Sequence, residues 1–223
     1  MSLTEQLLRG LSPAKPLITH YDDARGTRME LSVATVANWA AKTANWLVEE
    51  HDVEPGTEVA VRMPGHWQTA GILLGAWWAG AHVVADPAGA AVVVVPEGAE
   101  ADARTAVVSL DPMGMDLRGR QAAGTDFVAE VRLFGDAYFG APVPDGTPAL
   151  AGLTVAEVLA AADELPAGVR ALSTAEWTIP AGVLRAFVSP LKAGGSVVHV
   201  SNPDAGALDK HRATERTTHD ILG

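Results

Sequence analysis

The sequence predicts an α/β protein in three layers, with mostly parallel sheets and helices on both of their faces. Short apolar strands alternate with helices over most of the 223 residues. The strands expected at 92–95 and 106–109 lack alternation of apolar and polar residues, which is typical of strands covered on both faces. Residues 53–87 also contain a complete strand–helix–strand unit. Because parallel strands need such a crossover between them, the pattern favours parallel sheets.

Turn and capping residues mark this strand–helix–strand unit. A turn around Pro55 precedes a strand at 57–62. A helix follows at 66–79, and Gly80 ends it before a strand at 82–85. The helix contains several glycines, each of which would cost an exposed helix about 1 kcal/mol relative to alanine. We therefore expect this helix to lie close against a sheet.

The first fifty residues predict a short helix, a hairpin and a longer helix. Residues 2–10 form a short amphipathic pattern, and strands at 17–21 and 28–31 flank a turn rich in Asp and Gly. Ser32 is a good N-cap for a helix at 33–49, whose apolar residues recur with helical spacing.

Strands and helices continue to alternate after residue 87. Residues 111–124 are rich in turn-forming residues, and 140–148 form a loop rich in Pro and Gly. That loop is the best candidate for a lobe boundary, near 140–150, within a single expected domain of residues 1–223. The remaining strands are expected at 92–95, 106–109, 169–172 and 196–200, and the remaining helices at 125–134, 154–162, 180–193 and 203–220.

Composition excludes several functional classes. The chain has 48% hydrophobic and 19% charged residues, as a globular protein does, and its net charge of −11 disfavours nucleic acid and anionic membranes as partners. It has no cysteine, which excludes disulfides and thiol chemistry and fits a reducing compartment. We see no secretion signal and no apolar run of about 18 residues. We therefore expect a soluble, cytoplasmic protein.

Several short motifs follow one another in a specific order. They are Leu31-Ser32, VEPGTEVAV at 53–61, Met63-Pro64, AGA at 79–81, Asp86-Pro87 and PLKAGGSVV at 190–198. In this order they resemble the amino-terminal domain of the adenylate-forming superfamily, which includes acyl-CoA synthetases, nonribosomal-peptide adenylation domains and luciferases. The resemblance covers most of residues 28–87 and 150–200.

The sequence departs from that superfamily at the residues that carry catalysis. Active members hold the phosphates of ATP with a Ser/Thr/Gly-rich loop and a Lys. Here the segment PALAGLT at 148–154 connects the flanking strand and helix without such a loop, and the nearest lysines are Lys42 and Lys192. The Mg²⁺-binding Glu motif, the ribose-binding Asp and the carboxy-terminal lid with its catalytic Lys are also missing. The comparison therefore implies no cofactor, no catalytic residue and no adenylation.

The histidines do not predict a metal or acid–base site. The seven His are scattered without metal-binding spacing. We single out His20, which forms a tight group with the carboxylates of Asp22 and Asp23, and interpret this group as a solvated turn. No GxSxG elbow and no Gly-rich phosphate-binding motif is present. We assign no metal ligand.

The tryptophans give two candidate sites. Trp177 falls, with Ile179 and Gly182, where the resemblance implies an acyl pocket, so Trp177 either lines a remodelled pocket or packs as core. Trp39 and Trp46 are seven residues apart and project together from the helix at 33–49, away from its apolar stripe. Either the segment 2–21 covers them, or they form a face for a homo-oligomer or another protein partner.

Three functions stay open on this basis. The first is a non-catalytic relative of an acyl-CoA synthetase that acts as a protein-interaction or regulatory module. The second is a protein that binds a small acyl or aryl carboxylate, or a nucleotide, in a remodelled pocket. The third is an enzyme with unrecognised chemistry. Exposed aromatic residues would favour the first, an apolar cavity near Trp177 the second, and a perturbed titratable cluster in a cleft the third.

Overall fold

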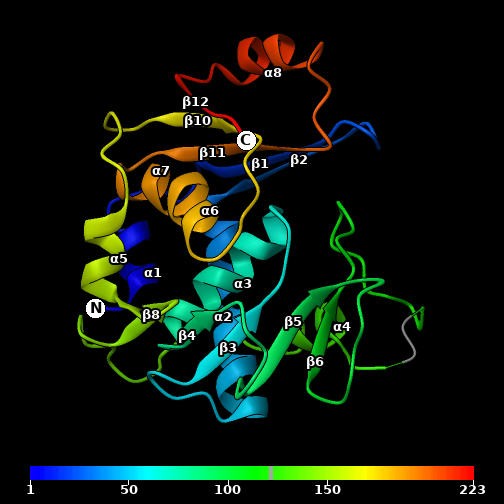
Figure 1. Ribbon diagram of the computed structural model, residues 1–223, viewed down its shortest axis with the longest axis vertical. Helices are drawn as coiled ribbons and strands as arrows, with labels where there is room; N and C mark the ends of the chain where they lie inside the picture. The colour runs from blue at the N-terminus through cyan, green and yellow to red at the C-terminus, as the bar shows by residue number, and fades with distance from the viewer. Residues whose placement is uncertain (121–122) are drawn as a thin grey trace.

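Two β-sheets enclose a layer of helices in this protein (Figure 1). The structure, a computed structural model, describes residues 1–120 and 123–223. The predicted α/β class with mostly parallel strands is confirmed, since the antiparallel pairs are confined to two hairpins. The three layers are the two sheets and the helices between them, and one further helix lies outside the smaller sheet.

The smaller sheet has five strands in the order β12-β10-β11-β1-β2. Strands β1 and β2 form the predicted antiparallel hairpin. The four strands β1, β11, β10 and β12 run parallel to one another. The strand bounds are β1 Pro16–Asp22, β2 Thr27–Ser32, β10 Arg170–Ser173, β11 Ser196–Ser201 and β12 His219–Ile221.

The larger sheet has seven strands in the order β7-β6-β5-β3-β4-β8-β9. Its strands are parallel except for the last hairpin, β8–β9. The strand bounds are β3 Glu58–Val61, β4 His82–Val84, β5 Val92–Pro96, β6 Thr105–Val108, β7 Thr125–Asp126, β8 Pro148–Leu150 and β9 Leu153–Thr154. The unit β3–α3–β4 is the strand–helix–strand unit predicted within residues 53–87.

Most helices lie between the sheets, and α8 lies on the outer side of the smaller sheet (Figure 1). The α-helices are α1 Leu3–Leu8, α2 Val33–His51, α3 Trp67–Trp78, α4 Phe127–Val131, α5 Val155–Ala161, α6 Ala181–Val183, α7 Ser189–Lys192 and α8 Leu208–Glu215, and a π-helical turn, η1, covers Leu184–Val188. Ser32 caps α2 and Thr154 caps α5 through their side chains, as their sequence positions indicated.

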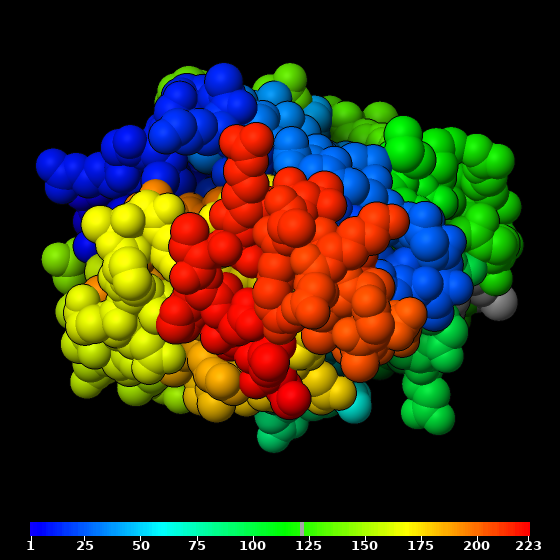
Figure 2. Space-filling model, turned by 90° about the horizontal axis from the view of Figure 1, so that it is seen from above, coloured from blue at the N-terminus to red at the C-terminus, as the bar shows by residue number. Residues whose placement is uncertain are grey.

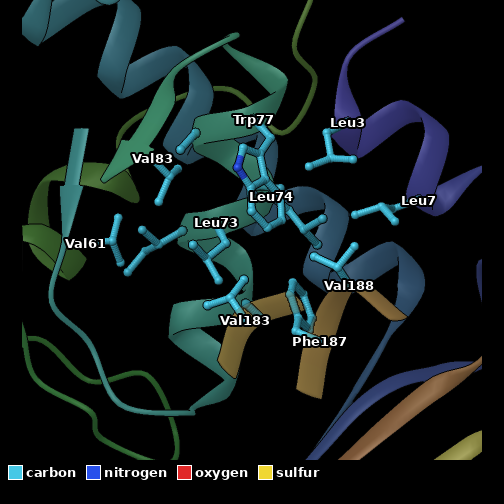
Figure 3. Packing of buried hydrophobic residues seen from close by; sticks show 14 of the residues in the cluster. Leu3, Leu7, Val61, Leu73, Leu74, Trp77, Val83, Val183, Phe187 and Val188 are labelled. Atoms are coloured by element: carbon cyan, nitrogen blue, oxygen red, sulfur yellow. The ribbon is translucent and has the colours of Figure 1, made fainter. Parts of the chain in front are cut away.

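Helix α3 is the centre of the hydrophobic core. Every residue from Trp67 to Trp77 is buried, which fits a helix that is apolar on all sides. Burying one such Leu side chain stabilises the fold by about 1.5–3 kcal/mol. Figure 3 shows α3 between the larger sheet, α1 and the segment 181–188, with Leu73, Leu74 and Trp77 of α3 facing Leu3, Leu7, Val61, Val83, Val183, Phe187 and Val188.

The glycines of α3 face another helix rather than a sheet. A Cβ on Gly75 would lie 2.5 Å from the Cβ of Thr43 and 2.7 Å from the carbonyl oxygen of Ala40, both in α2. A Cβ on Gly71 would lie 3.2 Å from the Cβ of Trp39. The close approach of helix α3 predicted from its glycines is therefore present, but helix α3 approaches helix α2 and not a sheet. The small residues at this contact let the two helix axes come together.

Each sheet also has an outer face. On the smaller sheet, Tyr21, Leu172, Val198 and Val200 pack with Leu208 of α8. In the space-filling view, the orange to red residues of α8 lie over this face (Figure 2). On the larger sheet, loop residues such as Leu117 cover the outer face in place of a helix.

Four sequence-based predictions need correction or stay open. Residues 203–220 do not form one helix: α8 ends where Arg216 adopts a left-handed conformation, with φ of 52°, and β12 then joins the edge of the smaller sheet. The helix at 180–193 contains the π turn, because Pro190 has no N–H to donate to the preceding turn. Of the turn-rich segment 111–124, residues 121–122 lie outside the described part. The lobe boundary near 140–150 stays a prediction.

Candidate functional site

A cleft of about 870 Å³ opens between the two sheets. It is lined by the carboxyl ends of β1, β3, β10 and β11 and by residues that follow β4 and β6. Ligands of parallel α/β sheets bind at this edge, because the loops that follow the strands gather there. The volume falls within the range of small-molecule sites, roughly 300–1,000 Å³.

Two of the three predicted pocket residues line this cleft. Trp177 and Ile179 are among its walls, in the segment that follows β10. Trp177 is buried and stacks on Phe187, with ring centroids 4.7 Å apart. Gly182 does not line the cleft: a Cβ there would lie 2.0 Å from the carbonyl oxygen of Glu176, so this glycine permits a tight turn. Trp177 therefore packs against the core and also borders the cavity.

Three buried histidines form one side of the cleft. His20 of β1 and His199 of β11 are register partners on adjacent parallel strands, and their rings stack at 5.9 Å between centroids. His66 precedes α3 and contacts the edge of the His20 ring at 4.3 Å. Trp177 meets the His199 ring edge-on at 5.5 Å. All three His are 4% exposed, so the histidine cluster His20–His66–His199 is part of the protein interior.

Burial keeps the three imidazoles neutral. Loss of solvent lowers the pKa of His20 to about 4, although Asp22 acts in the opposite direction. The same cause lowers the pKa of His66 to about 2 and that of His199 to about 3, and the neighbouring His rings add to the effect. At neutral pH the cluster therefore carries no charge.

The sequence-based interpretation of His20 is wrong. His20 is not in a solvated turn, because it belongs to β1 and points into the interior. Asp22 instead receives hydrogen bonds from the Arg25 backbone N–H and the Asn202 side chain. Asp23 accepts a hydrogen bond from His211 Nε2 at 2.8 Å. The group that looked like one cluster is divided between the cleft and the outer face.

Sequence reasoning missed His66 and His199 as site residues. The sequence did contain a signal that His20 and His199 lie together. His20 and Asp22 stand two residues apart at the end of β1, and His199 and Ser201 have the same spacing at the end of β11. Residues two apart on a strand share a face. Because parallel strands end at the same edge, these four side chains meet there.

The mouth of the cleft carries charges of both signs. Asp22, Arg25, Arg62 and Glu176 line it. The Arg25 guanidinium is 63% exposed and lies 3.5 Å from the Asp22 carboxylate. Arg62 forms no ion pair within the described part of the chain. Among the described residues Arg62 is therefore available to a ligand at the entrance, whereas Arg25 is paired with Asp22.

A tight hairpin occupies the place expected for the phosphate loop. Strands β8 and β9 are joined by Ala151 and Gly152, whose φ values are 46° and 86°. Two positive φ values are typical of a two-residue hairpin turn. The Gly152 N–H donates to Nε2 of His82 at 2.7 Å, so this backbone donor is already used. Lys42 and Lys192 are engaged elsewhere, with Asp136 and Glu164 respectively.

Over residues 1–120 and 123–223, no three His, Cys, Asp or Glu side chains are placed to hold a metal ion. In the same residues no helix combines the length and apolarity needed to span a membrane.

The predicted partner face is wrong for Trp46. Its indole is fully buried, donates from Nε1 to Glu130 at 3.0 Å and meets the Phe127 ring edge-on. Helix α4 thus covers it, rather than the segment 2–21. Trp39 is half-buried and packs against Trp67, with ring centroids 5.5 Å apart. That the protein binds a second copy of itself or another protein stays a prediction, but the pair Trp39 and Trp46 no longer supports it.

The fold is that of the amino-terminal domain of acyl-CoA synthetases and related adenylate-forming ligases. Similar solved structures include an acyl-CoA synthetase of Brucella canis (TM-score 0.76, 16% identity, covering 100% of this chain and 47% of that one). A benzoate CoA ligase from Burkholderia xenovorans LB400 gives a TM-score of 0.72 with 16% identity, covering 99% of this chain and 50% of that one. The chain spans about half the length of these structures.

A relative of similar length defines the family. A TIGR03089 family protein of Mycobacterium tuberculosis (strain ATCC 25618 / H37Rv) is 42% identical over 234 residues, which cover 97% of this chain and 95% of the relative. The chain belongs to this family. A scan against protein-family models finds no match.

Proposed function

We propose that this protein is a non-catalytic relative of the acyl-CoA synthetases that binds a small acyl or aryl carboxylate in the cleft without activating it. The observation that carries the proposal is the cavity of about 870 Å³ beside Trp177 and Ile179. An apolar wall with a few polar groups is the usual construction of a small-molecule site. The enzymes with the same fold include a benzoate CoA ligase.

The hairpin at Ala151-Gly152 supports the non-catalytic part of the proposal. Adenylation requires stabilisation of charge on the α-phosphate. The two-residue turn offers one backbone N–H to His82 and has no Lys beside it. The prediction is that pyrophosphate exchange with ATP, Mg²⁺ and a panel of carboxylic acids stays at background. Exchange that is lost on denaturation would show that the protein is an enzyme after all.

A thermal-shift screen tests ligand binding. A ligand at ten times its Kd stabilises the folded state by about 1.4 kcal/mol, which corresponds to a rise in Tm of roughly 3–6 °C for a protein of this size. We expect benzoate or a related acid to produce such a rise. Replacement of Trp177 by Leu should abolish it, whereas Trp78→Leu, outside the cleft, should retain it. A panel of acids, nucleotides and CoA without any effect would contradict the proposal.

An interaction module remains a second candidate. Leu133 and Phe139 are 85% and 93% exposed, which is unusual for large apolar side chains. If they mediate contact with a second copy of the chain, sedimentation should show an oligomer that dissociates in the double variant Leu133→Ser, Phe139→Ser. A monomer at all concentrations would remove this candidate.

A further inference from the structure

The positions of the protons in the histidine cluster follow from its hydrogen bonds. A neutral imidazole has one N–H and one bare nitrogen. Nδ1 of His66 accepts a hydrogen bond from the Gln68 backbone N–H at 3.1 Å, as the N-cap of α3. Nδ1 is therefore bare, and Nε2 carries the proton. No hydrogen bond from this N–H is formed among the described residues, and His66 lines the cleft.

The same argument fixes His20. Ser201 Oγ donates its single proton to the carbonyl oxygen of Gly65 at 3.2 Å. Oγ must then accept the hydrogen bond that joins it to Nε2 of His20 at 2.9 Å. His20 is also protonated on Nε2. Neither Ser201 nor His20 is arranged as a nucleophile with its base, because the serine proton points at a backbone carbonyl.

His199 completes the set. Its Nδ1 is buried without a hydrogen-bond partner. A buried N–H without an acceptor is rarer in proteins than a bare acceptor, which places the proton on Nε2. This nitrogen lies beside Gly65 and reaches the cleft. His66 and His199 therefore both present an N–H to the cavity.

Donors exceed acceptors throughout this part of the cleft. Trp177 Nε1, an obligate donor, is also buried without a partner. The positive end of α3 begins at His66, which adds to the preference for negative charge. Of the four charged groups at the mouth, Arg25 and Asp22 face each other at 3.5 Å, and Arg62 and Glu176 have no ion pair among the described residues. An acceptor oxygen supplied by a ligand would satisfy the buried Trp177 N–H and the N–H groups of the histidines.

From these observations we propose that His66 and His199 form a donor site for an oxyanion, with their Nε2–H groups bound to the same carboxylate or phosphate group. The site shares the cleft of the proposed function, and it gives a position for the head group of the ligand. The cluster is a binding site rather than a catalytic one, because no bare imidazole nitrogen faces the cavity.

Nitrogen NMR on the full chain tests the proton assignment and the binding together. Spectra of ¹⁵N-histidine-labelled protein at pH 7 should show the Nε2–H form for His20, His66 and His199. Titration with acetate and with inorganic phosphate should shift Nε2 of His66 and His199 saturably, and acetamide, the neutral analogue of acetate, should bind at least tenfold more weakly. The stronger of the two anions identifies the class of head group.

Variants separate binding from folding. His66→Asn keeps a capping acceptor for α3 but withdraws the donor from the cleft, and His199→Phe keeps an aromatic ring without an N–H. Each should weaken anion binding at least tenfold with circular dichroism unchanged. His219→Asn, in β12 and outside the cleft, should bind as the unmodified chain does. If His66→Asn or His199→Phe unfolds the protein, the other variant and the spectra of the unmodified chain test whether the two histidines bind the anion.

The outcomes distinguish this inference from the proposed function. Nδ1–H forms of His66 or His199, equal binding of acetate and acetamide, or no response to either anion would overturn the donor site. If the donor site is overturned but larger acids still raise the Tm, the proposed function stands without the donor site. If the small anions bind but no acyl or aryl acid raises the Tm, the oxyanion site stands and the proposed ligand class fails.

Discussion

Gly65 faces His199 so closely that no side chain fits between them. A Cβ on Gly65 would lie 2.3 Å from Nε2 and 2.4 Å from Cε1 of His199. The Gly65 carbonyl also accepts the hydrogen bond from Ser201. The backbone at the start of α3 is therefore part of the wall of the histidine cluster. The proline–glycine pair that ends β3 in the sequence has a packing role as well as a turn role.

Replacement of Gly65 by Ala should destabilise the protein and displace His199. Overpacking of a filled interior costs about 1–3 kcal/mol, which urea unfolding can measure. Gly146→Ala is a matched control, because a Cβ at that position would meet no atom within 4 Å and its backbone is not left-handed. That control should be neutral or slightly stabilising. Equal stability of the two variants would show that the Gly65 contact is easily relieved.

Glu215 joins α8 to the smaller sheet. Its carboxylate is buried and accepts hydrogen bonds from Tyr21, Arg28 and Arg170. Burial alone would raise the pKa of this carboxyl, but the bonds from Arg28 and its neighbours outweigh burial and lower it to about 2. Two arginines from different strands thus meet at Glu215, and both also contact Glu30.

Glu215→Gln should cost about 1.5–3 kcal/mol, because the guanidinium groups of Arg28 and Arg170 lose one charged acceptor and keep only Glu30 as an ion-pair partner. The folded pKa is depressed, so the contribution of Glu215 is present above its ordinary pKa, near 4.5, and is lost as pH falls toward 2. The stability gap between the two proteins should narrow over that window. Asp209→Asn, whose side chain is 96% exposed, should change stability by less than about 0.5 kcal/mol. A constant gap between pH 5 and 2.5 would contradict the assignment.

Trp46 gives a test of the covered helix face. Trp46→Ala should destabilise by about 3–5 kcal/mol through loss of the buried indole. Trp46→Phe should cost less, about 1–3 kcal/mol, since it mainly leaves Glu130 without its donor. Trp39→Ala, at a half-buried position, should destabilise the protein less than Trp46→Ala does. If Trp46→Ala folds with native stability and sediments as a smaller species, Trp46 belongs to an interface between chains.

Local patterns predicted the elements better than the site. Residues such as Ser32, Thr154 and Gly80 mark boundaries through short-range hydrogen bonds or backbone angles, which a sequence displays directly. Strand β12 was missed because its three residues form a strand only by pairing with β10. Its place in the sheet is a tertiary effect that outweighs local propensity.

The site required contacts that are distant in sequence. Trp177 and Ile179 could be placed by their position after a strand and by the family resemblance. The bond between His20 and Ser201 spans 181 residues and depends on the pairing of β1 with β11. Sequence spacing alone showed His20 beside two carboxylates and suggested a surface turn. Strand pairing at the sheet edge is what makes it an interior residue.

The histidine cluster predicts loss of stability in mild acid. The folded pKa values of His20, His66 and His199, about 4, 2 and 3, lie below the unfolded value of 6.5, and burial lowers the pKa of His51 as well. Below pH 6.5 the unfolded chain therefore binds more protons than the folded protein does. The free energy of unfolding is highest above pH 6.5 and falls as the pH decreases toward 4.

Each of His20, His66 and His199 should contribute roughly 1.4 kcal/mol per pH unit between about pH 6 and 5, a window above the titration of Glu215. Urea unfolding at several pH values measures the slope. His199→Phe should reduce the slope by one such contribution, because one buried imidazole no longer resists protonation. Phe187→Leu, a core change without a titrating group, should lower stability but leave the slope unchanged. A slope in His199→Phe equal to that of the unmodified chain would mean that His199 is protonated in the folded state, which would also remove it from the neutral donor site.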